Sequence, residues 1–136
     1  MCIRDRLRLI KLNYLKAFKA ADIDLTTEQW VVLDTLYTNN GVSQNELANG
    51  SFKDAPTVSR IINLLDKKGY AERQRFDNDR RRYKIFLTPK GKQVYEKALP
   101  VVEDLRIKGW GELNDEDYDT FIRIMNHIFA NFEEKE

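Results

Sequence analysis

Three consecutive arginines, Arg80 to Arg82, are the side chains of this sequence best suited to bind an anion. A guanidinium is always charged, and its planar set of N–H groups matches phosphate oxygens. The arginines follow Asp77-Asn78-Asp79, residue types that favour a turn, and precede the strand-like residues 83–87. With residues 71–76 as the partner strand, we predict a β-hairpin over residues 71–88 with the arginines clustered at its tip. Such bunched positive charge indicates an anionic partner at the tip.

A second set of candidate side chains lies on a helix predicted over residues 54–69. Arginine can bond guanine bidentately, asparagine can do the same with adenine, and hydroxyl groups reach bases or phosphates. An ordinary solvated helix face carries the same residue types, so this helix alone does not decide between the two interpretations. Together with the hairpin arginines, the candidate DNA-binding residues are Pro56, Thr57, Ser59, Arg60, Asn63, Arg80, Arg81 and Arg82.

The elements that position these residues can be predicted from periodicity and capping signals. Residues 7–21 have the apolar spacing of an amphipathic helix. Thr26 with Gln29 and Ser43 with Glu46 fit capping boxes that open two further helices. Predicted N-caps for the later helices are Asp54, Thr88 followed by Pro89, and Asn114. Two short helices joined by a turn and followed by a hairpin form a winged helix-turn-helix. We therefore predict a mainly α fold with a small β-hairpin.

The predicted domain organisation is one domain over residues 1–136, with the winged helix-turn-helix core at residues 26–91. Helices at residues 7–21 and 92–134 flank that core. Pro100 is expected to kink the long helix or remove a hydrogen bond there. The sequence Gly109-Trp110-Gly111 is expected to loosen the chain after it.

Charge is unevenly distributed along the chain, although the net charge is only +1. Residues 54–91 contain ten Lys or Arg and five Asp or Glu, whereas residues 92–136 contain six and eleven. A basic middle and an acidic end are informative about partners. The single Cys2 allows no internal disulfide, and the longest apolar run, residues 30–33, is too short to span a membrane. Without a signal-peptide pattern, we predict a cytoplasmic protein.

Catalysis has little support in the sequence. His127 is the single histidine and is expected to pack or to lie in an interface. There is no His/Cys cluster for a metal and no Gly-rich loop with phosphate-binding spacing. We predict no enzyme activity, no metal site and no cofactor.

The hairpin carries a recognisable spacing: Asp79-x-Arg81, five residues, Leu87-Thr88, two residues, then Gly91. This resembles the D-x-R-(x)5-L-T-x-x-G signature of the MarR family of bacterial transcription regulators, in which the hairpin is the wing. The resemblance implies that Asp79 braces a neighbouring arginine and that Arg81 reaches into the minor groove of DNA. Arg80 and Arg82 would then contact phosphates.

The resemblance also implies a homodimer formed by the N- and C-terminal helices. Their apolar stripes need a cover, although folding back onto the winged helix is an alternative that the residues leave open. The predicted interface residues are Leu7, Ile10, Tyr14, Phe18, Phe121, Ile122, Met125 and Phe129. Relatives often bind small aromatic effectors, and the corresponding pocket is predicted at Tyr14, Phe18, Trp30 and Trp110. Some relatives sense oxidants through a cysteine of the first helix, but Cys2 precedes the predicted helix, and no such role is expected.

These observations predict a homodimeric regulator that binds a pseudo-palindromic operator in double-stranded DNA. It is expected to act as a repressor that a small aromatic effector releases. A winged helix that binds an acidic protein instead of DNA is the first alternative. A small enzyme is the second, for which the sequence offers no recognisable site.

Overall fold

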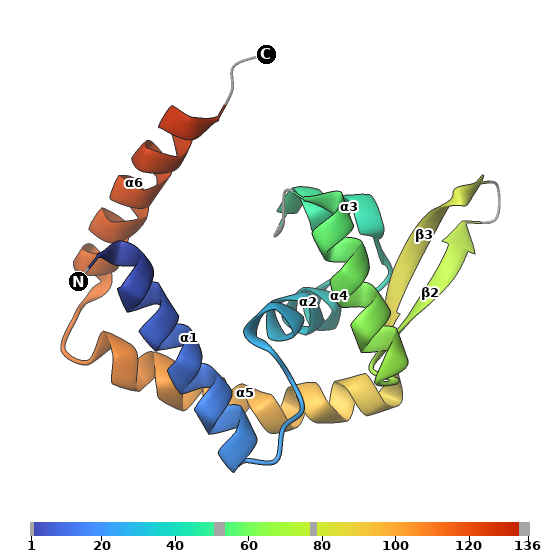
Figure 1. The fold of residues 1–136 in the computed structure, drawn as a ribbon, viewed down its shortest axis with the longest axis horizontal. Coiled ribbons are helices and arrows are strands. Elements are labelled where there is room, and N and C mark those ends of the chain that lie inside the picture. The colour runs from blue at the N-terminus through green and yellow to red at the C-terminus, as the bar shows by residue number, and fades with distance from the viewer. Residues whose placement is uncertain (1, 51–53, 77–78, 134–136) are drawn as a thin grey trace. The chain divides into compact units, whose positions relative to one another are not determined.

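The computed structural model describes residues 2–50, 54–76 and 79–133, with side chains of the last range described from residue 82 onward. Its elements, in chain order, are α1 (Ile3–Ala20), α2 (Thr27–Thr38), β1 (Val42–Ser43), α3 (Gln44–Gly50), α4 (Ala55–Lys67), β2 (Ala71–Phe76), β3 (Asp79–Leu87), α5 (Pro89–Trp110) and α6 (Asp115–Phe132) (Figure 1). The chain divides into two compact units, Met1–Val102 and Glu103–Glu136. The helix α5 begins in the first unit and ends in the second.

The fold class is as predicted: the chain is mainly helical and carries one small antiparallel sheet. The sheet has three strands in the order β1-β3-β2. The two-residue strand β1, which the sequence analysis does not predict, pairs Val42 with Ile85 and Ser43 with Lys84. A strand this short leaves no alternating pattern in the sequence. It nevertheless ties the start of α3 to the wing.

The hydrophobic core of the first unit joins the helix-turn-helix, the root of the wing and the first part of α5. Its fully buried side chains come from elements far apart in the sequence, including Leu33 of α2, Ile62 of α4, Ile85 of β3 and Val102 of α5. Apolar burial of this kind is the main term that stabilises such a unit. The core therefore fixes α4 relative to the wing.

The first helix departs from the prediction at both ends of its apolar stripe. It begins at Ile3 and not at residue 7, because Asp5 accepts a hydrogen bond from the backbone N–H of Cys2 (3.4 Å) and caps the first turn. Phe18, predicted in the dimer interface and the effector pocket, is only 1% exposed and belongs to the core of its own chain. It therefore offers no surface to a second copy.

Most predicted caps are confirmed. The hydroxyl of Thr88 accepts the N–H of Gly91 at 2.9 Å, and Pro89 takes the first position of α5. Capping boxes close at Thr26/Gln29 and at Ser43/Glu46. Asp54 occupies the N-cap position of α4, but its carboxylate makes no hydrogen bond to the backbone of the first turn. It accepts a hydrogen bond from the hydroxyl of Thr57 instead.

The second unit consists of the end of α5 and the helix α6. Asn114 caps α6 as predicted, and its side chain accepts the N–H of Asp117 at 2.9 Å. Trp110 ends α5, and its ring contacts those of Tyr118 and Phe121. The chain then turns at Gly111, whose φ of +53° confirms the predicted loosening of the helix. Through Pro100, α5 continues as a helix, and the expected kink stays a prediction.

Candidate nucleic-acid interface

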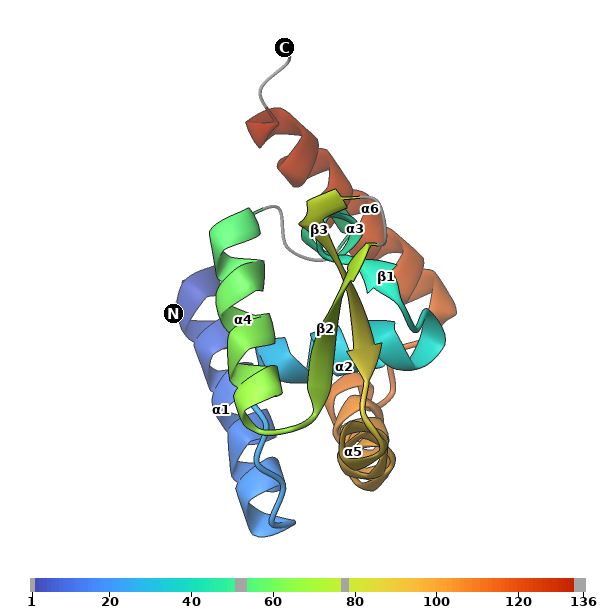
Figure 2. The same cartoon turned by 90° about the vertical axis from the view of Figure 1, so that its right-hand side faces the viewer.

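Helix α4 and the hairpin of β2 and β3 stand side by side, as Figure 2 shows, with β2 next to the helix. Helix α3 precedes α4 in the chain and packs against it. Residues Val58, Ile61, Ile62 and Leu65 form the buried side of α4, as predicted. This leaves the opposite side of the helix and the face of the wing free to meet a ligand together.

The hairpin is regular at its root and irregular toward its tip. From Ala71 opposite Leu87 to Arg75 opposite Tyr83, each residue of β2 has one partner on β3. The next pair is Phe76 with Asp79, so three residues of β3 fall between two adjacent pairs. These extra residues are Arg80, Arg81 and Arg82, which corrects their predicted place in the turn. Bulged residues are a common means of turning side chains away from a sheet.

The described part of the wing is basic below the tip as well. Lys84 holds its ammonium 4.8 Å from the centroid of the Phe76 ring, a cation–π contact within the hairpin. Arg75 and Arg82 are exposed. The side chains of Asp79, Arg80 and Arg81 lie outside the described residues, so the brace and the groove assignments stay predictions.

The polar side of α4 carries the remaining predicted residues. Pro56, Arg60 and Asn63 are exposed, whereas Thr57 and Ser59 are half-buried. The hydroxyl of Thr57 already donates its one proton to Asp54. In this arrangement the Thr57 hydroxyl can only accept a hydrogen bond. It therefore cannot bind a phosphate oxygen, which is also an acceptor.

Arg73 of β2 is the functional candidate that sequence reasoning missed. Its Nε donates to Oε1 of Gln44 on α3 (3.3 Å), and its Nη2 donates to the carbonyl oxygen (3.2 Å) and the hydroxyl (3.4 Å) of Ser59. Its Nη1 donates to Oδ1 of Asn63. Strand alternation was the signal, because Arg73 shares a face with the buried Ala71. One guanidinium thus links the wing with both helices of the helix-turn-helix.

A polar cleft of about 530 Å³ lies between α3, α4 and the wing. Ser59, Arg73 and Arg82 line it together with Gln44, Asn45 and Glu46 of the α3 N-terminus. Its lining residues are up to 40 positions apart in the chain. The hydrogen bonds of Arg73 connect the three elements that form the cleft: α3, α4 and the wing. Hydrogen-bonding groups and charges of both signs therefore face one shared hollow.

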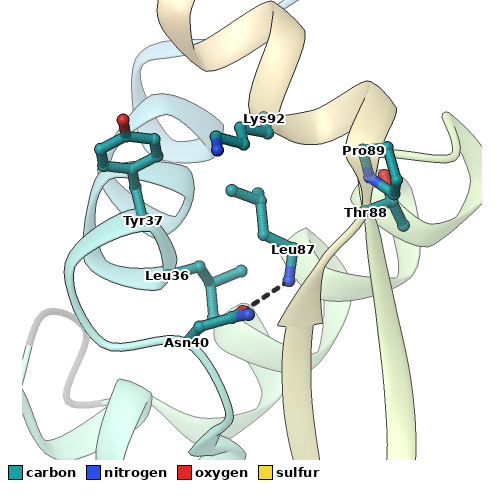
Figure 3. Close-up of a pocket in the computed structure, with 7 residues that line it drawn as sticks. All are labelled: Leu36, Tyr37, Asn40, Leu87, Thr88, Pro89 and Lys92. Atoms are coloured by element: carbon teal, nitrogen blue, oxygen red, sulfur yellow. Dashed lines mark hydrogen bonds between the residues drawn. The ribbon is translucent and has the colours of Figure 1, made fainter.

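A second cavity, of about 540 Å³, lies between α2, the end of β3 and the start of α5. Figure 3 shows Leu36, Leu87 and Pro89 around it, with Lys92 extending from α5 toward the side on which Tyr37 lies. Asn40 accepts the N–H of Leu87 at 2.8 Å and closes one edge. The cavity therefore combines apolar walls, an aromatic ring and one ammonium group.

Aromatic stacking connects this cavity with the core. The Tyr95 ring stacks on Trp30 (4.8 Å between centroids) and on Tyr37 (4.2 Å), which is 44% exposed. Of the residues predicted for an effector pocket, Phe18 and Trp30 are buried and Tyr14 packs against the same core. Trp110 belongs to the second unit. None of these four lines the cavity of Figure 3.

Two further properties concern chemistry and location. Among the side chains of residues 2–50, 54–76 and 82–133, no three His, Cys, Asp or Glu residues are grouped so that they could hold a metal ion. In the same part of the chain, no helix combines the length and apolar character needed to cross a membrane.

The arrangement of α3, α4 and the β2–β3 hairpin defines a winged helix-turn-helix protein. A model of the MarR family matches residues 23–82. The HTH-type transcriptional regulator SarZ of Staphylococcus aureus (strain MRSA252) is 30% identical over 124 residues, which cover 89% of this chain and 78% of SarZ. The transcriptional repressor MprA of Escherichia coli K12 is 25% identical over 136 residues, or 100% of this chain and 77% of MprA. The chain belongs to the MarR family.

A solved structure agrees with this assignment at the level of the fold. The S. aureus MepR–DNA complex superposes with a TM-score of 0.84 at 23% identity, over 96% of this chain and 94% of MepR. Such a likeness covers the terminal helices as well as the winged helix-turn-helix.

Proposed function

We propose that this protein is a homodimeric, non-enzymatic repressor that binds a pseudo-palindromic DNA operator in the cytoplasm. The observation that carries the proposal is the joint face of α4 and the wing. On this face Arg60 and Asn63 are exposed beside the basic hairpin. The width of an α-helix such as α4 suits the major groove, and the wing beside it would reach the flanking phosphates and the minor groove.

The charge distribution supports the same role. Positive charge is concentrated in residues 54–91, which form α4 and the wing, and negative charge in residues 92–136. Phosphate contacts supply most of the non-specific affinity for DNA. An acidic C-terminal part would keep that end of the chain away from the duplex.

Dimerisation is supported by apolar side chains that the single chain leaves exposed. On α1 these include Leu7 (59% exposed) and Ile10, and on α6 they include Phe121, Met125 and Phe129. No residue of α6 is buried in the described chain. Contiguous exposed apolar faces mark interaction sites, and a two-fold homodimer is the commonest assembly.

A small aromatic effector is supported by the cavity of Figure 3. The apolar side chains of Leu36 and Leu87, the Tyr37 ring and the Lys92 ammonium suit an aromatic acid. The cavity joins α2, the last residue of the wing and the first turn of α5. A ligand there would act directly on the junction between the DNA-binding core and the helix α5.

The DNA-binding role is tested by titrating the full chain with random-sequence duplex at several salt concentrations. The logarithm of the affinity should fall linearly with the logarithm of salt concentration, by roughly 0.9 per neutralised phosphate. An affinity that does not depend on salt would contradict DNA binding and favour a winged helix that binds protein.

The effector site is tested by calorimetry with phenol and benzoate. Benzoate should bind more tightly, and Lys92→Met should remove the difference because the ammonium group is lost. Lys108→Met, on the same helix but not among the residues that line the cavity, is the control. An unchanged preference in Lys92→Met would place the effector elsewhere.

A further inference from the structure

We infer that Arg73 sets the base preference of α4, the helix proposed to read the major groove, by fixing how Asn63 presents its amide group. The inference rests on the proposed DNA-binding role. Arg73 lies at the root of the wing and is not among the residues expected to read bases. Its effect would act through Asn63, so Arg73 is a positioning residue.

The first step concerns which atom of Asn63 meets the guanidinium. A guanidinium has five N–H donors and no acceptor. The atom of the Asn63 amide group that faces the guanidinium must therefore be the oxygen. Nη1 of Arg73 indeed donates to Oδ1 of Asn63. The amide NH₂ group of Asn63 is then directed away from Arg73 on an exposed side chain.

The second step concerns how firmly Arg73 is held. Its Nε and Nη2 bond to Gln44 of α3 and Ser59 of α4, and its guanidinium carbon lies 6.0 Å from the centroid of the Tyr83 ring. Within the described part of the chain, its acceptors on Gln44, Ser59 and Asn63 are all uncharged. The positive charge of Arg73 is thus fixed beside Asn63, and the hydrogen bonds do not neutralise it.

The third step concerns the bases. Bidentate recognition of adenine needs Oδ1 to accept from the N6 amino group while the NH₂ group donates to N7. Oδ1 keeps a second lone pair, but the amino group of adenine would have to approach beside the guanidinium, donor against donor. Guanine presents two acceptors, O6 and N7, which suit the donating NH₂ group of Asn63. Asn63 as positioned by Arg73 therefore selects guanine.

Arg73 also turns the Ser59 hydroxyl into a donor. Its hydroxyl oxygen accepts from Nη2 of Arg73 at 3.4 Å, which leaves its proton to be donated elsewhere. Two neighbouring side chains of α4 thus present donors as a consequence of one arginine on the wing. This differs from the usual expectation that asparagine on a recognition helix reads adenine.

The test is selection of bound duplexes from a randomised library by the full chain, followed by sequencing. Asn63→Ala identifies the base pair that Asn63 meets, because the preference at that position alone disappears. The unsubstituted protein should select guanine there. Arg73→Met removes every donor but keeps an unbranched apolar stem, and it should lower the guanine-to-adenine ratio at that position about tenfold.

Arg75→Met is the matched control, because it removes an exposed arginine from the same strand, two residues away. It should weaken binding to all sequences without changing the guanine-to-adenine ratio. Asn63→Asp provides a second variant that keeps Arg73 in place, should Arg73→Met fail to fold. Its carboxylate offers only acceptors, so the preference should change from guanine to cytosine, whose N4 donates.

Three results would overturn the inference: selection of adenine at this position by the unsubstituted protein, a guanine preference that Arg73→Met or Asn63→Asp leaves unchanged, or no position affected by Asn63→Ala. In each case binding with a normal salt dependence would leave the proposed function standing. Loss of salt-dependent binding to every duplex in the unsubstituted protein would instead contradict the proposed function itself.

Discussion

The carbonyl oxygen of Tyr70 lies 1.9 Å from the point that a β-carbon on Gly91 would occupy. The same carbonyl accepts the N–H of Thr88 at 3.1 Å, so the first turn of α5 is held directly against the chain that enters the wing. This close approach explains why the last position of the wing motif, residue 91, must be glycine. Any side chain would push α5 away from the root of the wing.

Gly91→Ala should therefore lower the free energy of unfolding by about 3 kcal/mol, at the upper end of overpacking effects, because the clash is with backbone. Gly109→Ala is the control on the same helix, since a β-carbon there meets nothing within 4 Å. That variant should be neutral or more stable, as alanine is the better helix former. Urea denaturation of both variants checks the difference, and equal midpoints would contradict it.

Lys68 should contribute to stability through a buried amide group. Its Nζ donates to Oε1 of Gln29 at 2.9 Å, and Gln29 is only 3% exposed. Lys68→Met should cost about 1–3 kcal/mol, because the buried Gln29 loses a charged donor and Asp24 loses its ion pair with Lys68. Lys67→Met changes the exposed neighbour and should have little effect. If both variants unfold at the same urea concentration, the Gln29 contact contributes nothing measurable.

Glu28 should link the stability of the α1–α2 pair to pH. Partial burial raises its pKa, but the hydrogen bond and charge of Lys11, with help from the Glu28 backbone and Thr27, outweigh this and hold the pKa below the ordinary value for a glutamate. A lowered pKa in the folded state stabilises the fold above the unfolded pKa, and this contribution is lost as the pH falls through the folded value. Lys11→Ala should move the pKa of Glu28 upward in an NMR titration of its carboxyl carbon. Lys16→Ala, an exposed change on the same helix, should leave it in place.

The dimer proposal makes a prediction about mass. Leu7→Glu places a charge on an exposed apolar face of α1 and should reduce the mass in light scattering from twice the chain mass of 16.1 kDa toward that mass. Burying an unpaired carboxylate in an interface is strongly unfavourable. Arg8→Glu, a larger change of charge at the adjacent position, should stay dimeric. A dimeric Leu7→Glu protein would exclude this part of α1 from the interface.

The family resemblance assigns Arg81 to the minor groove, which distinguishes mainly A·T from G·C. Arg81 should therefore contribute to DNA affinity and little to sequence preference. Arg81→Ala should weaken binding to selected and random duplexes by similar factors and flatten the salt slope by about one contact. Asp79→Ala should have part of the same effect if Asp79 braces Arg81. Binding of each variant to both duplexes at matched salt is the measurement. A loss confined to the selected duplex would assign Arg81 to base recognition instead.

The features that could be predicted from the sequence depend on neighbours close in the chain. A capping box joins a side chain to backbone three residues away, so Thr26 with Gln29 and Asn114 with Asp117 are visible in the sequence alone. The wing motif is visible for the same reason. Its glycine has a cause that only the fold reveals, the approach of Tyr70.

Features that depend on distant contacts could not be predicted in this way. Arg73 meets Gln44 across 29 positions, and strand alternation places it on the same face as the exposed Arg75, so alternation alone does not show which of the two makes this contact. Phe18 has the same helical spacing as the exposed residues of α1, but the core that covers it comes from other elements. The three extra residues in β3 likewise appear only when the register is known.

The register of the wing has a consequence for engineering. The five regular pairs from Ala71–Leu87 to Arg75–Tyr83 hold the hairpin on the core, and the irregularity begins only beyond Arg75. Side-chain alternation in the root therefore does not depend on how many residues the tip contains. A tip of another length or charge can be grafted between Arg75 and Tyr83 while the hydrophobic partners of the root stay in phase. The tip of the wing can therefore be exchanged while its root stays packed on the core. Variation in the tip can change DNA affinity without changing the packing of the core.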